Sequence, residues 1–395
     1  MSQIVAASPH VTTKNSTAVI MRDVLIALCP ALIAGCVVFG LRALLVVAVT
    51  TAACIFFEWG YEKLCGKPST ICDLSAAVTG VLLAMNLPVS IPLWQAVFGA
   101  LVAMVAVKGL FGGIGKNFAN PAATARVFLL LAYGSMTAQF IGADVGNMIL
   151  GDVSTSATYL SGGVNALQDS FWGVSGYWGY VLQLFFGVTG GSIGETCIPA
   201  ILAGGVYLCV RKIIDWRIPV VYIATSALMV LACYQSASEI LLQLFAGGLM
   251  FGAVFMATDY ATSPKWEYNR ILYAVGLGVV TVLIRKFGIY PEGVSLAILI
   301  MNLFVPLMDR YILPVRFGQL DSKGAPVKPV MKYAMWILCA VGALSLVESG
   351  QLSLDKDLSA YLGYPVRNPH APDCPVTLRM LLTHSAAIRD EGNYG

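Results

Sequence analysis

Long apolar segments recur along most of this chain and limit its fold more than any other feature. About 20 predominantly apolar residues are long enough to cross a lipid bilayer as a helix. Such segments can be drawn at approximately residues 23–40, 42–60, 72–88, 91–111, 120–137, 195–213, 217–234, 237–256, 270–287 and 290–308. Only 11% of the residues are charged, against about 25% in a typical soluble domain. The sequence therefore predicts an all-α, polytopic membrane protein with about ten transmembrane helices.

The positions of Lys and Arg predict which side of the membrane each loop faces, because basic residues gather in cytoplasmic loops. They gather here at alternate ends of the apolar segments, beginning with Lys14 and Arg22. No Lys or Arg occurs from Val127 to Val210. We therefore expect a cytoplasmic N-terminal segment, 1–22, and a long outer loop, 138–194. Arg42, Arg285 and Lys286 are exceptions to this scheme.

The outer loop separates two sets of five segments, and each set contains a polar break with proline and threonine. The stretch "GLFGGIGKNFANPAATARVFLLL" covers 109–131, and "GLMFGAVFMATDYATSPKWEYNRILY" covers 248–273. An odd number of spans per half would make the halves inverted repeats, in which such breaks are typical of a central site. The two breaks are offset by one span. The candidates for a central site or ion path are Asn120, Thr124, Arg126, Asp259 and Thr262.

Ionisable residues inside a membrane favour a functional reading. For Arg126 and Asp259, pairing with each other or with groups at the cytosolic edge is the structural alternative.

Several stretches resemble the NqrB/RnfD family of membrane subunits. They are "SPH" at 8–10, "GGIGKNFANPAATARVF" at 112–128, "GSIGET" at 191–196, "MATDYATSP" at 256–264 and "YPEGVSLAILIMNLFVPLMDRY" at 290–311. The resemblance covers about residues 8 to 318. It implies a membrane subunit of an Rnf-type complex that couples electron transfer between ferredoxin and NAD to translocation of Na+ or H+. The implied partners are other Rnf-type subunits, a flavin transferase and membrane lipid, without nucleic acid, in the bacterial inner membrane.

The stretch "DVSTSAT" at 152–158 is unusually polar for this chain. The residues alone favour an ordinary Ser/Thr turn. The resemblance implies instead that FMN is attached through its phosphate to the hydroxyl of Thr158, and the family also suggests a second, non-covalent flavin, riboflavin. The motif around Thr158 comprises Asp152, Thr155, Ser156 and Ala157. Ser156 stands where the family commonly has glycine, and Tyr159 where proline is frequent.

The motif "GSIGET" contributes Gly191, Ser192, Glu195 and Thr196. Its residues are typical of a helix N-terminus with an acidic first turn. Exposed N–H groups at such a terminus could equally face the polar edge of a flavin. Both interpretations stay open.

The ten cysteines include no Cys-x-x-Cys pair, so we expect buried apolar side chains rather than metal ligands. We assign no catalytic residue to the chain, because the redox chemistry would belong to the flavin and the assembly.

The end of the chain departs from this pattern. Residues 23–318 form the predicted membrane domain and 319–332 a linker, and 333–395 resemble a fragment of a serine β-lactamase-like hydrolase. No Ser-x-x-Lys precedes Glu348 in this tail, and "SLDK" at 353–356 lies beyond the expected nucleophile helix. We expect the tail to be inactive. A membrane-tethered serine hydrolase is therefore one alternative function, and a passive small-solute channel or transporter of inverted-repeat fold is the other.

Overall fold

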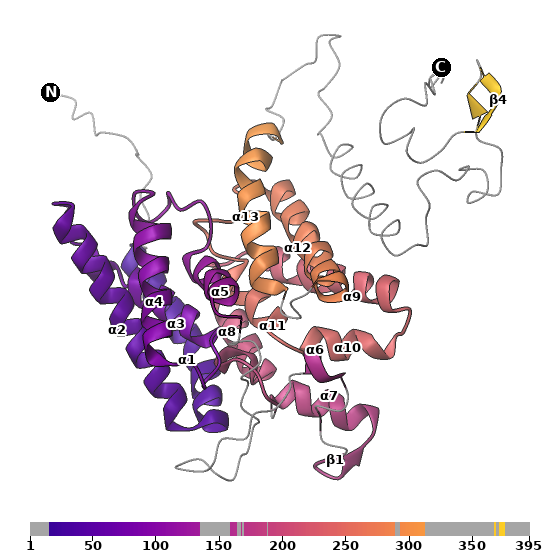
Figure 1. Cartoon of the computed structure of the whole chain (residues 1–395), viewed down its shortest axis with the longest axis horizontal. Coiled ribbons are helices and arrows are strands. Elements are labelled where there is room, and N and C mark those ends of the chain that lie inside the picture. Colours follow the sequence, from indigo (N-terminus) through magenta and orange to yellow (C-terminus); the bar gives the residue numbers. More distant parts are fainter. Residues whose placement is uncertain are drawn as a thin grey trace, which may run out of the picture. The chain divides into compact units, whose positions relative to one another are not determined.

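The computed structural model describes residues 16–134, 159–163, 167, 170–187, 189–288, 293–312, 367–368 and 371–375. The chain divides into two compact units, 1–313 and 314–395. In the second unit the described residues form one antiparallel pair of strands, β3 (Arg367–Asn368) and β4 (Ala371–Pro375). In the first unit the described residues are mostly helical (Figure 1).

The first set of predicted segments is helical. The elements are α1 (Thr17–Phe39), α2 (Leu41–Leu64), η1 (Ile71–Asp73), α3 (Ser75–Met85), α4 (Leu93–Leu101), its π-helical continuation η2 (Val102–Gly109) and α5 (Pro121–Ala132). Helix α5 begins where expected for its sequence, because Asn120 caps it and Pro121 occupies the first turn. Proline suits that position, where the backbone has no N–H partner to lose.

The second set is helical as well. Its elements are α8 (Ile198–Val210), α9 (Arg217–Tyr234), α10 (Ser238–Phe245), α11 (Leu249–Phe251), the π-helix η6 (Gly252–Met256), α12 (Glu267–Phe287) and α13 (Val294–Tyr311). Between the sets lie α6 (Tyr159–Gly162), the hairpin of β1 (Ser170–Phe171) and β2 (Val174–Ser175), α7 (Tyr177–Phe186) and the short turn η5 (Ile193–Glu195).

Two of the predicted segments are interrupted. The segment drawn at 72–88 is an α-helix only over Ser75–Met85, since Asn86, Leu87 and Pro88 break it. The segment drawn at 237–256 is bent by 66° between α10 and the helix that follows. Gly247 lies at this bend with φ of 64°, a backbone angle that favours glycine.

The helices differ in length, and so in whether each is long enough to cross a membrane. In the described part of the chain, α1, α2 and α9 are long and apolar enough to cross a membrane, and the bent pair would make a fourth span. Helices α3, α5 and α8 are apolar but shorter. The number of spans and their arrangement as inverted repeats therefore stay predictions.

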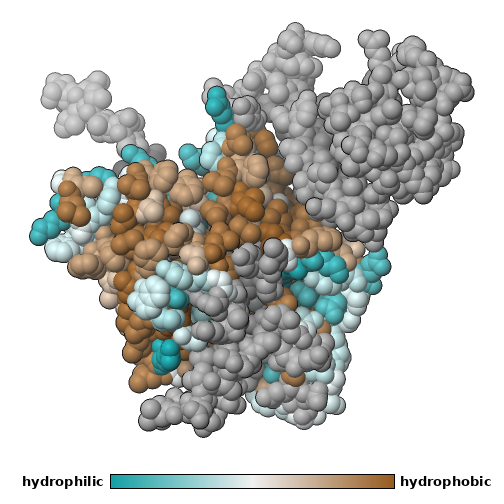
Figure 2. All heavy atoms as spheres, in the orientation of Figure 1, coloured by the Kyte–Doolittle hydropathy of each residue, from teal (hydrophilic) through white to brown (hydrophobic). Residues whose placement is uncertain are grey.

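The helices pack pairwise. Helix α1 contacts α8, α2 contacts α3 and α4, and α12 contacts α9 and α13. The core contains large side chains with less than 2% exposure, among them Tyr222, Phe251 and Tyr273. Figure 2 shows a broad apolar surface over the helices, with hydrophilic residues gathered toward its edges. Exposed side chains such as Ile33, Val206 and Leu228, each more than 60% accessible, suit contact with lipid rather than water. The prediction of a helical membrane protein is confirmed.

Candidate functional site

Three polar breaks meet near the middle of the chain's first unit. Asn86, directly after α3, donates from Nδ2 to the Leu82 carbonyl at 2.7 Å and lies 3.3 Å from the Met256 sulfur. Asn120, directly before α5, donates from Nδ2 to the Met256 carbonyl at 3.3 Å. Met256 is the last residue of η6. The ends of α3 and η6 and the start of α5 therefore lie together.

This meeting point accounts for the one-span offset between the two breaks seen in the sequence. In chain order, α3 is the third helix of the first set and the bent α10–α11 pair is the third of the second set. Each is followed by a break, at Asn86 in the first set and at Ala257 in the second. The break at 109–120 lies one helix further on, between η2 and α5. It joins the others through Asn120.

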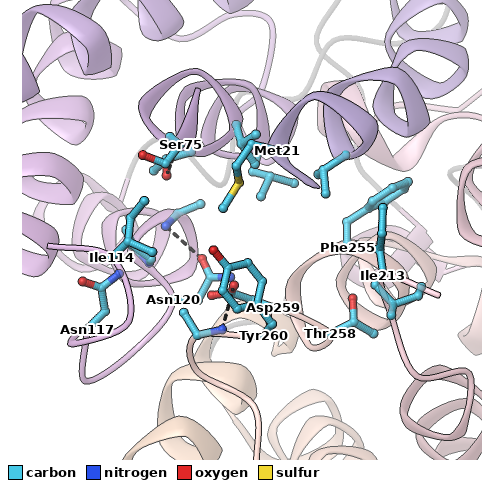
Figure 3. A pocket seen from close by; sticks show the side chains of 18 of the residues that line it. Met21, Ser75, Ile114, Asn117, Asn120, Ile213, Phe255, Thr258, Asp259 and Tyr260 are labelled. Atoms are coloured by element: carbon cyan, nitrogen blue, oxygen red, sulfur yellow. Dashed lines mark hydrogen bonds between the residues drawn. The ribbon is translucent and has the colours of Figure 1, made fainter. Parts of the chain in front are cut away.

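A cavity of about 80 Å³ adjoins the break before α5 and the break after η6. Figure 3 shows Asn120, Asp259 and Tyr260 near one another, with Ser75 and Met21 across from them. Two of the predicted central residues, Asn120 and Asp259, line it.

The other three predicted central residues support the cavity from outside its lining. Thr124 donates to the Asn120 carbonyl at 2.9 Å, and Thr262 donates to Asp259 Oδ2 at 3.1 Å. Arg126 is buried, at 3% exposure.

The Asp259 carboxylate lies in the loop between η6 and α12. Its Oδ1 accepts a hydrogen bond from the Ala261 N–H at 3.3 Å. Burial raises the pKa of Asp259, and the bonds from Ala261 and Thr262 oppose that rise. The side chain therefore holds a proton more tightly than an exposed aspartate does.

A second polar cluster lies beside this cavity, and sequence reasoning missed it. The Lys108 ammonium, 4% exposed, binds the Glu58 carboxylate and donates to Ser75 Oγ at 2.5 Å. Ser75 Oγ in turn donates to Asp73 Oδ1 at 2.5 Å. On the other side of Glu58, the Thr70 hydroxyl lies 3.3 Å from Glu58 Oε1 and also binds Glu62. These six residues form one continuous network, which we call the Glu58–Lys108 network.

All members of the Glu58–Lys108 network except Ser75 line a further cavity, of about 330 Å³, which we call the acidic cavity. Glu58 and Glu62 are one helical turn apart in α2, so both carboxylates occupy the same face. Two acidic residues in an apolar segment are a functional signal in a membrane protein. No local pattern reveals the partner of Glu58, because Lys108 lies 50 positions further along the sequence.

The motif "GSIGET" forms a turn of its own. Gly191 and Ser192 precede the 3₁₀ turn η5, and α8 begins at Ile198. The Ile193 N–H donates to the Leu87 carbonyl at 3.2 Å, so the turn is fixed to the break after α3. Glu195 Oε2 accepts from the Ser192 N–H at 3.4 Å. Ser192 and Glu195 form a capping box around η5, so the motif does begin a turn with an acidic residue in it, and α8 follows from Ile198.

A small pocket of about 10 Å³, which we call the outer pocket, lies between the motif and the start of α6. All four predicted residues of "GSIGET" line it, together with Tyr159, Leu160 and Gly247. Thr158, Asp152, Thr155, Ser156 and Ala157 lie outside the described residues. Tyr159, which follows Thr158 in the chain, lies at the wall of this pocket.

Two polar contacts hold the surroundings of the outer pocket. The Tyr159 hydroxyl donates to Glu239 Oε2 at 2.9 Å. Burial, and then the bond to Glu239, raise the pKa of Tyr159. Arg285 donates to the carbonyls of Gln243 at 2.5 Å and Ala246 at 3.0 Å. These carbonyls lie at the end of α10. Arg285, an exception to the predicted charge topology, therefore caps the C-terminus of this helix.

Comparison with known proteins bears on both ends of the chain. A model of the NQR2, RnfD, RnfE family matches residues 4–318, and a β-lactamase model matches residues 337–395. The D subunit of the Na(+)-translocating ferredoxin:NAD(+) oxidoreductase complex of Acetobacterium woodii is 45% identical over 310 residues, 78% of this chain and 92% of that protein. The D subunit of the proton-translocating ferredoxin:NAD(+) oxidoreductase complex of Clostridium ljungdahlii is 37% identical over 322 residues, 80% and 96% of the two chains.

A more distant similarity extends to another complex. The B subunit of the Na(+)-translocating NADH-quinone reductase of Chromohalobacter salexigens is 37% identical over 265 residues, 64% of this chain and 61% of that protein.

Proposed function

Because the chain belongs to the NQR2, RnfD, RnfE family, we propose that it is the D-type membrane subunit of an Rnf-like complex. That complex would couple electron transfer between ferredoxin and NAD to movement of Na+ or H+ across the bacterial inner membrane. The observation that carries the proposal is the similarity to the D subunits of two ferredoxin:NAD(+) oxidoreductase complexes over most of both chains. Since one of these moves Na+ and the other protons, the similarity supports either ion.

The partners follow from the same similarity. The relatives are named as subunits of a complex, so other Rnf-type subunits would surround this chain. Membrane lipid would contact its apolar surface, and a flavin transferase would act on the outer loop. The N-terminus would be cytoplasmic.

A flavin in the outer region is the second part of the proposal. FMN linked to Thr158 would accept and donate electrons at this side of the membrane. At about 10 Å³ the outer pocket has room for about one water-sized group, so only the edge of a flavin would enter it. Gly191 and Gly248 both adjoin the Glu195 carboxylate, where an added Cβ would lie 3.1 Å from an oxygen atom. A flavin held there would lie beside Tyr159, the neighbour of the attachment residue.

The protein's own contribution in this region is positioning. Glu195 is fixed by the Ser192 N–H, and the wall carrying Tyr159 is fixed by Glu239. These contacts hold the wall of the outer pocket in one arrangement, which keeps a bound group at a constant distance from its electron partners.

The ion path is the third part. We assign it to the cavity lined by Asn120 and Asp259 together with the Glu58–Lys108 network, because ionisable side chains buried among apolar helices are otherwise unfavourable. A cation would meet the carboxylates of Glu58, Glu62 and Asp73 first and Asp259 afterwards.

Covalent flavin tests this proposal against its alternatives. The chain, co-expressed with a flavin transferase and separated on a denaturing gel, should fluoresce as a flavoprotein. A passive channel or a serine hydrolase would give a dark band. A dark band from material that assembles with the other subunits would rule out the covalent cofactor.

A further inference from the structure

Lys108 occupies the wall between two cavities. Its side chain lines the cavity that holds Asp259 and also the acidic cavity, and Ile114 shares both linings with it. The side chain emerges from the penultimate residue of the π-helix η2, a kind of helical distortion that often occurs at functional sites. A lysine on such a wall can present its charge to either side.

Acidic side chains outnumber basic side chains around Lys108. The Glu58–Lys108 network contains the carboxylates of Glu58, Glu62 and Asp73 and a single ammonium, and Lys67 also lines the acidic cavity. Glu58 Oε2 is buried and has no hydrogen-bond partner. Among the described residues, no three acidic, His or Cys side chains converge as a metal cage would require. The Lys108 ammonium is therefore the cation that neutralises Glu58 in this state, because a buried carboxylate without a counter-charge is strongly unfavourable.

A lysine is better suited than an arginine to leaving one ion-pair partner for another. Its charge is compact and sits on a flexible stem of four carbons, whereas arginine presents a rigid fork. The Ser75 hydroxyl, which accepts from the ammonium at 2.5 Å, belongs to both the network and the lining of the Asp259 cavity. A short movement of the stem would carry the ammonium from Glu58 toward that cavity.

Resting on the proposed role in ion translocation, we propose that Lys108 is a tethered substitute for the transported cation. In the ion-free state its ammonium neutralises Glu58. When Na+ or H+ reaches Glu58 from the acidic cavity, the ammonium leaves, and its positive charge moves into the cavity that holds Asp259. One positive charge arrives at Glu58 as one departs, so the carboxylate stays neutralised throughout.

Replacing the ammonium by a neutral side chain tests this exchange. Lys108→Gln and Lys108→Met, in the intact complex, should remove a competitor from Glu58. The Na+ concentration that half-saturates electron transfer should then fall by about tenfold, the ratio that corresponds to about 1.4 kcal/mol. If protons are the transported ion, the pH of half-maximal activity should instead rise, because Glu58 would bind a proton at higher pH. The maximal rate should fall in both variants, since nothing displaces the bound ion.

Matched variants separate exchange from structural support. Lys108→Arg keeps a positive charge and should leave half-saturation unlowered. Lys63→Met, at an exposed lysine whose ammonium lies over the Trp59 ring outside the network, should change neither parameter. If neither single neutral variant assembles, the double variant Glu58→Gln, Lys108→Met removes both buried charges and should abolish the dependence on cation concentration.

The outcomes are distinguishable. Half-saturation that is unchanged or raised in the neutral variants, or a double variant that keeps the cation dependence, would overturn the role of Lys108. Failure of the broader proposal would look different, because Glu58→Gln and Asp259→Asn would then leave ion transport by the complex unaltered.

Discussion

The Asn120 side chain donates a hydrogen bond to the Met256 carbonyl, 136 positions later in the chain. The same side chain accepts from the N–H groups of Ala122 and Ala123, at 3.0 and 3.3 Å, and so caps α5. One amide thus starts a helix of the first set and ties it to the end of η6 in the second.

Replacing Asn120 should therefore weaken both the start of α5 and the attachment of that helix to η6. We expect Asn120→Ala to lower the free energy of unfolding by about 2 kcal/mol, the sum of a helix cap and a buried hydrogen bond. Asn120→Ser should lose about half as much, because serine caps helices but is too short to reach Met256. Thermal unfolding in detergent, followed by circular dichroism of the helices, reports this difference. Equal losses in the two variants would contradict the double role.

Thr158 should be the attachment residue for FMN. Thr158→Val keeps the shape and removes the hydroxyl, so it should abolish covalent flavin fluorescence when the transferase is co-expressed. Thr155→Val should keep the fluorescence. Ser156→Gly should be flavinylated at least as well as the parent, because glycine relaxes the backbone. Peptide mass spectrometry locates the adduct, and FMN found on Thr155 would disprove the assignment.

The lack of Lys and Arg between 127 and 210 predicts an outer location for the central loop. A single cysteine introduced near Asn165 should react with an impermeant thiol reagent added outside the cell. One introduced at Lys212 should react only after the membrane is opened. Reaction of the Asn165 position from the cytoplasm alone would overturn the order of spans.

The C-terminal tail should be dispensable. Deletion of Gln319 to Gly395 should leave membrane insertion and flavin content unchanged, since the family match ends at residue 318. The intact chain should also fail to react with an acylating β-lactam probe, because the tail has no Ser-x-x-Lys in the expected helix. Stoichiometric labelling at Ser353 would revive the hydrolase function.

Asp259 should make stability depend on pH. Burial raises its pKa above the ordinary value of 3.8, so the folded protein binds this proton more tightly than the unfolded chain. Ionising the buried Asp259 carboxyl destabilises the folded protein. This destabilisation should be absent below pH 3.8, grow as pH rises toward the raised pKa and then level off. Asp259→Asn should remove this pH-dependent loss of stability, so the melting temperature of the variant should fall less between pH 4 and pH 8. Parallel curves for the two proteins would show that Asp259 titrates normally.

The sequence predicted the helical segments well, because long apolar runs depend on local composition. It predicted their interruptions less well. The sequence predicted one continuous segment across the 66° bend near Gly247, because the residues around this bend are all apolar or small. The helix in 72–88 was drawn too long, although Pro88 gave a signal there.

The candidate site was also predictable only where its residues stand out locally in the sequence. Asn120 and Asp259 were found because their polar stretches stand out locally. The Glu58–Lys108 network was missed, because only the packing of α2 against η2 and α3 brings its members together. Arg285 was treated as an exception to charge topology, whereas its contacts with the end of α10 make it a helix cap.

The short helix α3 and the bent helix that ends in η6 have an electrostatic consequence. Aligned peptide dipoles place about half a negative elementary charge at a helix C-terminus. The C-terminal ends of both helices lie at Asn86 and Met256, where they meet. Two negative poles thus meet one positive pole, the start of α5 that Asn120 caps. Their sum leaves about half a negative elementary charge, so the backbone here favours a passing cation over an anion, and the amide side chains of Asn86 and Asn120 add no charge of their own.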